Sequence, residues 1–160
     1  METIAIYWEP VIKTYGIIER TGLSLVSLAL DSTRSDPAII DYLDAARTRD
    51  NVKIVFASGA TDEGLRVNIL LDGEAALPGD GDSPPGLRVD APVELVYFQG
   101  PHFGDRYGIA QAALDALADA NIALRSMVCA GASVYLVVPE GQAGAAGKAL
   151  TKAFAVPNST

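Results

Sequence analysis

The order of apolar and polar positions along the chain repeats once. Residues 24–30 (SLVSLAL) can be laid over residues 94–100 (ELVYFQG), and the patterns that follow them come in the same order at nearly the same spacing. Each copy reads strand, loop, helix, strand, turn, strand. The sequence therefore predicts two related structural units within one chain.

The first copy has a clear helix signal. A strand is followed by a polar loop at 31–36 and a helix at 37–47. Asp36 is a suitable N-cap, and the proline that follows it is favoured at the first position of a helix. The apolar residues expected on one side of this helix are Ile39, Ile40, Leu43 and Ala46. Residues 51–58 and 65–71 are β-rich, and the turn residues between them predict a hairpin.

The second copy contains the same elements and one more helix. Its expected elements are a strand at 93–99, a loop at 100–107, a helix at 108–120, strands at 122–128 and 133–138, and a helix at 142–154. A final strand would complete a βαββαβ unit, but only residues 155–160 remain. Strand-like patterns at 3–8 and 12–18 precede the first copy. We therefore expect the N-terminal segment to fill a vacant sheet position.

These patterns predict an α+β protein of the ferredoxin-like class, with tandem βαββαβ units whose antiparallel sheets carry helices on one face. The expected domains are 1–72, with extra N-terminal strands and an abbreviated first unit, and 93–160 as the second unit. Residues 73–92 are rich in glycine and proline and are expected to form a linker. The first unit is abbreviated because residues 74–77 are too short for a second helix.

Composition narrows the classes of partner. With 49% hydrophobic and 20% charged residues, the 160-residue chain can bury a sizeable core. A net charge of −8 disfavours nucleic acid and anionic membranes as partners, so an RNA-binding module is the last alternative. We expect no signal peptide and no transmembrane span, because the longest apolar stretch, 23–30, has eight residues. Cys129 is the single cysteine, cannot form an internal disulfide, and leaves the cytoplasm as the expected location.

The loops between the first strand and the helix of each copy are the candidate ligand sites. The candidates in the second copy are His102, Gly104, Asp105, Tyr107, Gly108, Ile109 and Ala110, and those in the first copy are Asp31, Ser32 and Asp36. Glycines allow close approach of the backbone, Asp105 could accept an ammonium group, and the helix amides could hold a carboxylate. That combination suits a free amino acid. The structural alternative is a capped turn, with Asp31 and Asp36 serving as loop and cap charges.

Three segments of the second copy, taken in order, point to a known family. They are Gly-Ile-Ala at 108–110, Ala-Asn-Ile at 120–122 and Ser-Val-Tyr-Leu-Val-Val-Pro-Glu at 133–140. This pattern resembles ACT domains, and in particular the C-terminal regulatory region of aspartate kinases. The resemblance extends over residues 23–154 and implies a tandem pair of regulatory domains, with an effector bound at the strand-to-helix loops and across paired domains. It implies a stand-alone, non-catalytic sensor of an amino acid or related small carboxylate.

Two other functions remain open. One is an enzyme that uses His102 together with Asp105, Arg106 or Tyr107. The other is a structural or adaptor subunit with degenerate ligand sites. Cys129 is interpreted as a small buried residue, at the end of an apolar strand.

We expect no metal and no cofactor, because no cluster of cysteines and histidines has ligand spacing. The strand at 133–138 is apolar on both faces, so its second face must be covered by the other copy, the N-terminal strands or a second chain. We therefore expect a homodimer, and a regulated enzyme is a further candidate partner.

Overall fold

The computed structural model describes residues 10–30, 37–47, 50–61, 64–73 and 86–156. The side chains of residues 38, 39, 46, 47, 58–61 and 105 are outside this description. The chain divides into two compact units, which we call unit 1 (Met1–Thr21 and Glu94–Thr160) and unit 2 (Gly22–Val93). Unit 2 is thus an insertion in the chain of unit 1.

The elements follow one another in a strand-rich order. They are β1 (Gly16–Leu30), α1 (Pro37–Arg47), β2 (Val52–Thr61), β3 (Gly64–Asp72), β4 (Leu87–Gln99), the 3-10 helix η1 (Phe103–Asp105), α2 (Ile109–Asp119), β5 (Ser126–Ala130), β6 (Ser133–Pro139) and α3 (Ala143–Ala153). The described helices are all too short to cross a membrane.

Strand order identifies the fold of each unit. The hydrogen-bonded order is β2-β3-β1-β4-β6-β5, and β1 and β4 each contribute residues to both units. Unit 2 has the order β2-β3-β1-β4, and unit 1 has β1-β4-β6-β5. Both are the order of a βαββαβ fold, if the first part of β1 counts as the fourth strand of unit 1. The ferredoxin-like fold class is confirmed.

The strand pairs are antiparallel. This holds for β1 with β3, β2 with β3, and β5 with β6. For β1 with β4, the backbone N–H of Tyr15 donates to the Gln99 carbonyl at 2.8 Å and that of Ala29 donates to the Gly86 carbonyl at 3.2 Å. Since these two bonds join opposite ends of the two strands, this pair is antiparallel as well.

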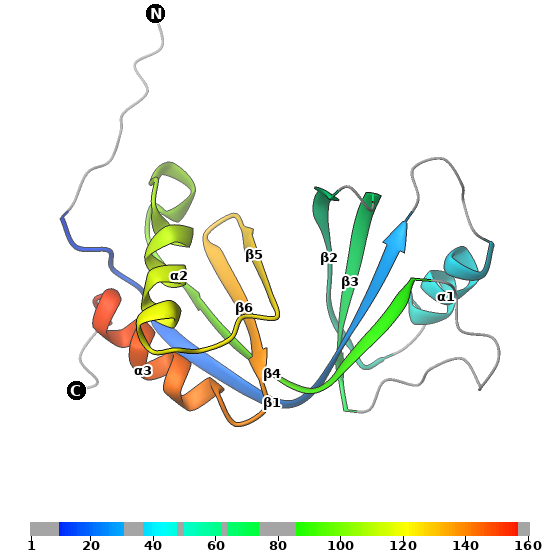
Figure 1. The fold of residues 1–160 in the computed structure, drawn as a ribbon. Helices are drawn as coiled ribbons and strands as arrows, with labels where there is room; N and C mark the ends of the chain where they lie inside the picture. The colour runs from blue at the N-terminus through cyan, green and yellow to red at the C-terminus, as the bar shows by residue number, and fades with distance from the viewer. Residues whose placement is uncertain (1–9, 31–36, 48–49, 62–63, 74–85, 157–160) are drawn as a thin grey trace, which may run out of the picture. The chain divides into compact units, whose positions relative to one another are not determined.

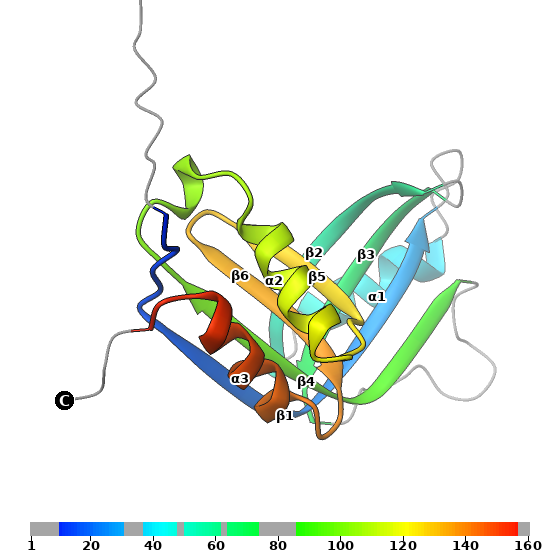
Figure 2. The ribbon, with the colours of Figure 1, turned by 60° about the vertical axis from the view of Figure 1, so that its left-hand side comes forward.

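Unit 1 has one apolar core between its sheet and two helices, α2 and α3, which lie on the same face of the strands (Figures 1 and 2). Its buried members are Val96, Phe98, Phe103, Ile109, Ala113, Leu117, Val134, Leu136, Val138, Ala143, Ala146, Leu150 and Phe154. The ring centroids of Phe98 and Phe154 are 4.8 Å apart, and those of Phe98 and Phe103 are 5.8 Å apart. This aromatic group joins β4, η1 and the end of α3.

The fourth strand of unit 1 comes from the N-terminal side of the chain, but the separate strand predicted at 12–18 is wrong, because the chain from Gly16 continues to Leu30 as the single strand β1. The C-terminal segment contributes one parallel bridge, between Lys13 and Ala155. The N–H of Thr14 donates to the Ala155 carbonyl at 2.9 Å, and the N–H of Ala155 donates to the Ile12 carbonyl at 2.8 Å. The predicted strand at 3–8 lies outside the described residues.

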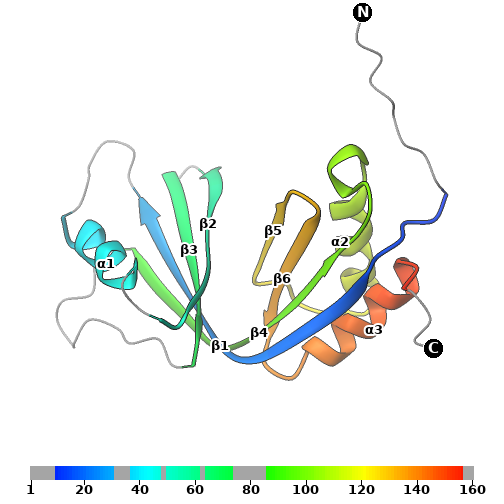
Figure 3. The same ribbon diagram turned by 180° about the vertical axis from the view of Figure 1, so that it is seen from behind.

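Unit 2 packs α1 on one face of its strands (Figure 3). The buried residues of this core are Val26, Leu28, Tyr42, Ile69 and Leu71. The predicted inner face of α1 was wrong in one respect, because Ile40 is 51% exposed and Tyr42 only 5%. Two residues along an α-helix are separated by roughly 200° around its axis, so burial of the large Tyr42 ring turns Ile40 outward.

The units also differ from the predicted domain boundaries. Residues 1–21 group with 94–160, and residues 87–92 belong to β4, where a linker was expected. The physical reason is strand pairing. β4 begins at Leu87, before the repeated segment that starts at residue 94, and it pairs with β1. The first unit was predicted to lack a second helix because residues 74–77 are too short for one. These residues belong to the segment 74–85, which lies outside the described residues.

The strand predicted at 122–128 begins only at Ser126. The N–H of Ile122 donates to the Leu117 carbonyl at 2.9 Å, and that of Asn121 donates to the Ala118 carbonyl at 2.9 Å. Asn121 has a left-handed φ of 54°, so these bonds form a Schellman cap that ends α2. The amide of Ile122 therefore closes the helix and does not pair in the sheet.

Candidate functional site

The loop between β4 and α2 is held in place by apolar packing. Phe103, in η1, is 7% exposed and packs edge-on against Phe98. A Cβ atom on Gly100 would collide with the Lys13 carbonyl and the Phe103 ring, so this close approach requires glycine. Phe103 therefore anchors the loop to the core of unit 1.

A pocket of about 220 Å³ lies at the start of α2. Its walls come from the β4–α2 loop, the first turn of α2, and the β5–β6 hairpin. The lining residues are Phe103, Arg106, Tyr107, Gly108, Ile109, Ala110, Cys129, Gly131, Ser133 and Val134. We call this the α2 pocket.

The N-cap residue at the α2 pocket makes no side-chain bond to the helix. Gly108 is the N-cap of α2, with φ 87°, and as glycine it has no side chain that could bond to the first amides. The first turn also contains no acidic residue. Because the first amides of a helix have no intrahelical partners and carry partial positive charge, they favour an anionic group such as a carboxylate.

Sequence reasoning located part of this pocket. Tyr107, Gly108, Ile109 and Ala110 all line it, as a group. Gly104 and His102 are exposed and are not among the lining residues. The side chain of Asp105, and all of Asp31, Ser32 and Asp36, lie outside the description. The predicted site in unit 2 therefore stays a prediction.

The hairpin residues of the α2 pocket were missed. Cys129, Gly131, Ser133 and Val134 belong to β5, β6 and the turn between them. The predicted βαββαβ order could have located these residues. In that order, the turn between the second and third strands lies at the same end of the sheet as the loop between the first strand and the first helix.

Cys129 is exposed, so its interpretation as a buried residue was wrong. It lies on β5, which is an edge strand of unit 1 and so leaves one side of the residue open. Partial burial beside the pocket nevertheless raises the pKa of the thiol above its ordinary value. The raised pKa favours the neutral thiol, which is the less nucleophilic form.

Arg106 is the cationic residue of the pocket wall. Its Nη1 donates to the Val11 carbonyl at 3.3 Å, which ties the loop to the segment before β1. Tyr107 beside it is 89% exposed. Within the described residues, no group of three or more His, Cys, Asp or Glu side chains could hold a metal ion. The arrangement is that of a small binding pocket with backbone donors.

No protein-family model matches the chain, and no curated protein matches it in sequence. Solved structures do match. Aspartate kinase from Clostridium acetobutylicum has a TM-score of 0.70 at 15% identity, over 92% of this chain and 36% of that one. The regulatory subunit of aspartate kinase from Thermus flavus has a TM-score of 0.69 at 12% identity, over 88% of this chain and 98% of that one.

A third structure is the T-state of E. coli aspartokinase III in complex with lysine and aspartate. Its TM-score is 0.58 at 13% identity, over 91% of this chain and 34% of the other. The chain thus spans about a third of the two kinases and nearly all of the regulatory subunit. At these identities the likeness establishes the fold, which is the tandem ACT-type fold of aspartate kinase regulatory regions.

Proposed function

We propose that the protein is a non-catalytic regulatory protein that binds an amino acid or related small carboxylate through its ACT-like units. The observation that carries this proposal is the α2 pocket, where Gly108 and the first residues of α2 line a space of about 220 Å³. A carboxylate at the amides of Ile109 and Ala110 would satisfy donors that the helix itself leaves open.

The comparisons support the same class of ligand. One neighbour binds lysine and aspartate, and another is a regulatory subunit in its own right. By analogy, a ligand bound by this chain would shift the population of its quaternary states, and a regulated enzyme would be the partner that reads the shift. The homodimer and the cytoplasmic location belong to this proposal.

A screen by thermal shift and calorimetry tests the proposal. The ligands are the common amino acids and small carboxylates, and a ligand at 100 times its Kd should stabilise the protein by about 2.7 kcal/mol. Absence of any stabilisation across the screen would contradict the proposal. The adaptor alternative would then be tested by capture of a partner protein, and the enzyme alternative by loss of turnover in His102→Ala.

A matched pair of variants locates the site. Ala110 is half-buried and lines the α2 pocket. Ala110→Glu places a carboxylate there, and Ala110→Gln adds a neutral side chain of the same size. We expect binding about tenfold or more weaker in the Glu variant than in the Gln variant, because like charges in one site repel. If the Glu and Gln variants bind the ligand equally, the ligand lies outside the α2 pocket. If both of them bind it as tightly as the wild-type protein does, the loop of unit 2 becomes the candidate site.

A further inference from the structure

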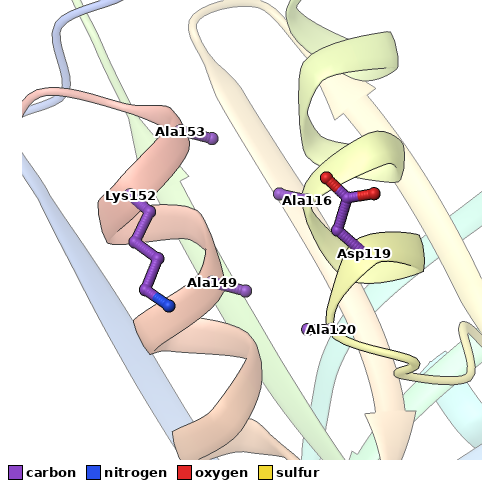
Figure 4. A pocket seen from close by; sticks show the side chains of 6 residues that line it. All are labelled: Ala116, Asp119, Ala120, Ala149, Lys152 and Ala153. Atoms are coloured by element: carbon purple, nitrogen blue, oxygen red, sulfur yellow. The ribbon is translucent and has the colours of Figure 1, made fainter.

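The outer surface of α2 and α3 contains a second hollow, on the side of the helices away from the sheet of unit 1. It has a volume of about 280 Å³ and is lined by Ala116, Asp119, Ala120, Ala149, Lys152 and Ala153 (Figure 4). We call it the helix groove. Four of its six lining residues are alanines, so the groove is open enough for another helix to approach closely.

The two charged residues of the helix groove lie on opposite walls. Asp119 is on α2 and Lys152 is on α3, with their backbones at a similar level along the helices (Figure 4). The Lys152 side chain extends down along α3, and the Asp119 carboxylate points in the other direction along α2 (Figure 4). Both are exposed, and neither side chain has a hydrogen bond or ion pair to the described residues. Asp119 is also the last residue of α2, where the helix dipole disfavours a carboxylate. A cation from outside the chain would remove that penalty.

This arrangement of charges is self-complementary. A twofold axis parallel to the helices would place α2 of one copy over α3 of the other, so that each Asp119 meets a Lys152. A twofold axis across the helices would instead place α3 over α3 and bring the two Lys152 side chains together. Only the first arrangement pairs opposite charges on both sides of the groove.

We propose that the helix groove is the interface with a second copy of this chain, packed with α2 against α3 of the partner. The alanines set a close approach between the helices, and two symmetric pairs of Asp119 and Lys152 fix the orientation. A second copy fits better than an acidic or a basic partner, because either of those would match one wall and oppose the other. The proposal rests on the homodimer of the proposed function but not on ligand binding at the α2 pocket, so the interface and the ligand site can fail separately.

Charge reversal tests the interface by sedimentation velocity at about 1–100 μM. We expect Asp119→Lys and Lys152→Glu each to raise the dimer Kd about tenfold or more, because each replaces both opposite-charge pairs with like-charge pairs. An equimolar mixture of the two variants should form a heterodimer, because Lys at 119 then meets Glu at 152, and Lys152 meets Asp119. Pairing within one chain cannot produce that recovery.

Two controls separate this interface from general electrostatics. Asp115→Lys and Lys148→Glu change the net charge by the same amounts on the same helices, at positions that do not line the groove, and should leave the Kd nearly unchanged. The chain carries a net charge of −8, so general repulsion would make Asp119→Lys associate more tightly, opposite to our expectation.

Three results would overturn the proposal: a wild-type monomer at 100 μM, a dimer insensitive to both reversals, or a mixture that fails to recover. Circular dichroism verifies that each variant is folded. If a reversal prevents folding, Ala149→Gln provides an uncharged test, since it fills the half-buried wall of the groove without a change of charge. It should also weaken the dimer, and an unchanged Kd would count against the interface.

Discussion

Unit 1 and unit 2 follow the same order of elements, yet their equivalent positions use different chemistry. Val26 and Leu28 of β1 correspond to Val96 and Phe98 of β4, and all four are at most 1% exposed. These positions face the helices in both units. The comparison indicates that burial under the helices is the requirement that both copies share.

The positions between them have diverged. In unit 2, Ser27 Oγ donates to Asn68 Oδ1 at 2.7 Å across β1 and β3. The equivalent residues of unit 1 are Tyr97 and Tyr135, whose rings stack with centroids 5.7 Å apart. A hydrogen-bonded pair in one unit is therefore replaced by an aromatic pair in the other, on the sheet face opposite the helices.

The first residue of each repeat, Ser24 or Glu94, makes a side-chain hydrogen bond to the backbone, as a donor in unit 2 and as an acceptor in unit 1. Ser24 Oγ donates to the Gly73 carbonyl at 2.7 Å, and Glu94 Oε2 accepts from the Ala143 N–H at 2.7 Å. Each bond joins the first strand of its unit to the chain that follows the third strand. In unit 1 the carboxylate caps α3, whose N-cap residue, Gln142, makes no side-chain bond to the helix.

The largest expected effect concerns the shared buried positions. Phe98→Ala should lower the free energy of unfolding by about 3–5 kcal/mol, because it leaves a cavity beside Phe103 and Phe154. Leu28→Ala, the matching change in unit 2, should cost about 2–5 kcal/mol. Urea unfolding gives the totals, and hydrogen exchange should locate each loss in its own unit. A loss below about 1 kcal/mol for Phe98→Ala would contradict this account of the core.

An intermediate loss of unfolding free energy is expected when the hydrogen bonds of Glu94 and Ser24 are removed. Glu94→Ala should cost about 1–3 kcal/mol, because Glu94 is 7% exposed and its loss leaves a buried amide without an acceptor. Ser24→Ala should cost about 0.5–1.5 kcal/mol, the range of a neutral bond. Glu94→Gln retains an acceptor oxygen and is the control. Equal losses in Glu94→Ala and Glu94→Gln would show that the negative charge, and not the acceptor, stabilises α3.

The smallest effect concerns Cys129, the single cysteine of the chain. Since partial burial raises its pKa, alkylation by iodoacetamide should reach half its maximal rate at a higher pH than in the unfolded chain. The sign for stability follows: the neutral thiol is favoured in the fold, so stability is retained below the ordinary pKa and declines as the pH rises through the raised value. A midpoint at or below that of the unfolded chain would contradict the assigned burial.

Local signals predicted the helices closely. The expected ranges 37–47, 108–120 and 142–154 correspond to α1, α2 and α3 within one residue at each end. The ends of a helix depend on capping residues that lie within a few positions of it in the chain, so they can be predicted from the sequence. The strand at 122–128 failed for a related reason, because its first residues serve the cap of α2.

The candidate site was predicted only along its continuous segment. Tyr107 to Ala110 were found because the glycine and the helix start are adjacent in sequence. Ser133 and Cys129 lie outside this continuous segment, on the next two strands, and reach the α2 pocket through the pairing of β5 with β6. His102, the basis of the enzyme alternative, directly precedes the lining residue Phe103 in the chain but is not itself a lining residue.

The sequence by itself determined the element types, the repeat, the ferredoxin-like class and the helix start at Gly108, because these depend on periodicity and on local backbone preference. The tertiary structure decided which segments complete each unit: β1 supplies the fourth strand of unit 1, and β4 extends back to Leu87. It also decided which hairpin closes the α2 pocket and which charged residues line the two walls of the helix groove. Strand partners and pocket walls arise from contacts between residues far apart in the chain, and a local pattern contains no record of those contacts.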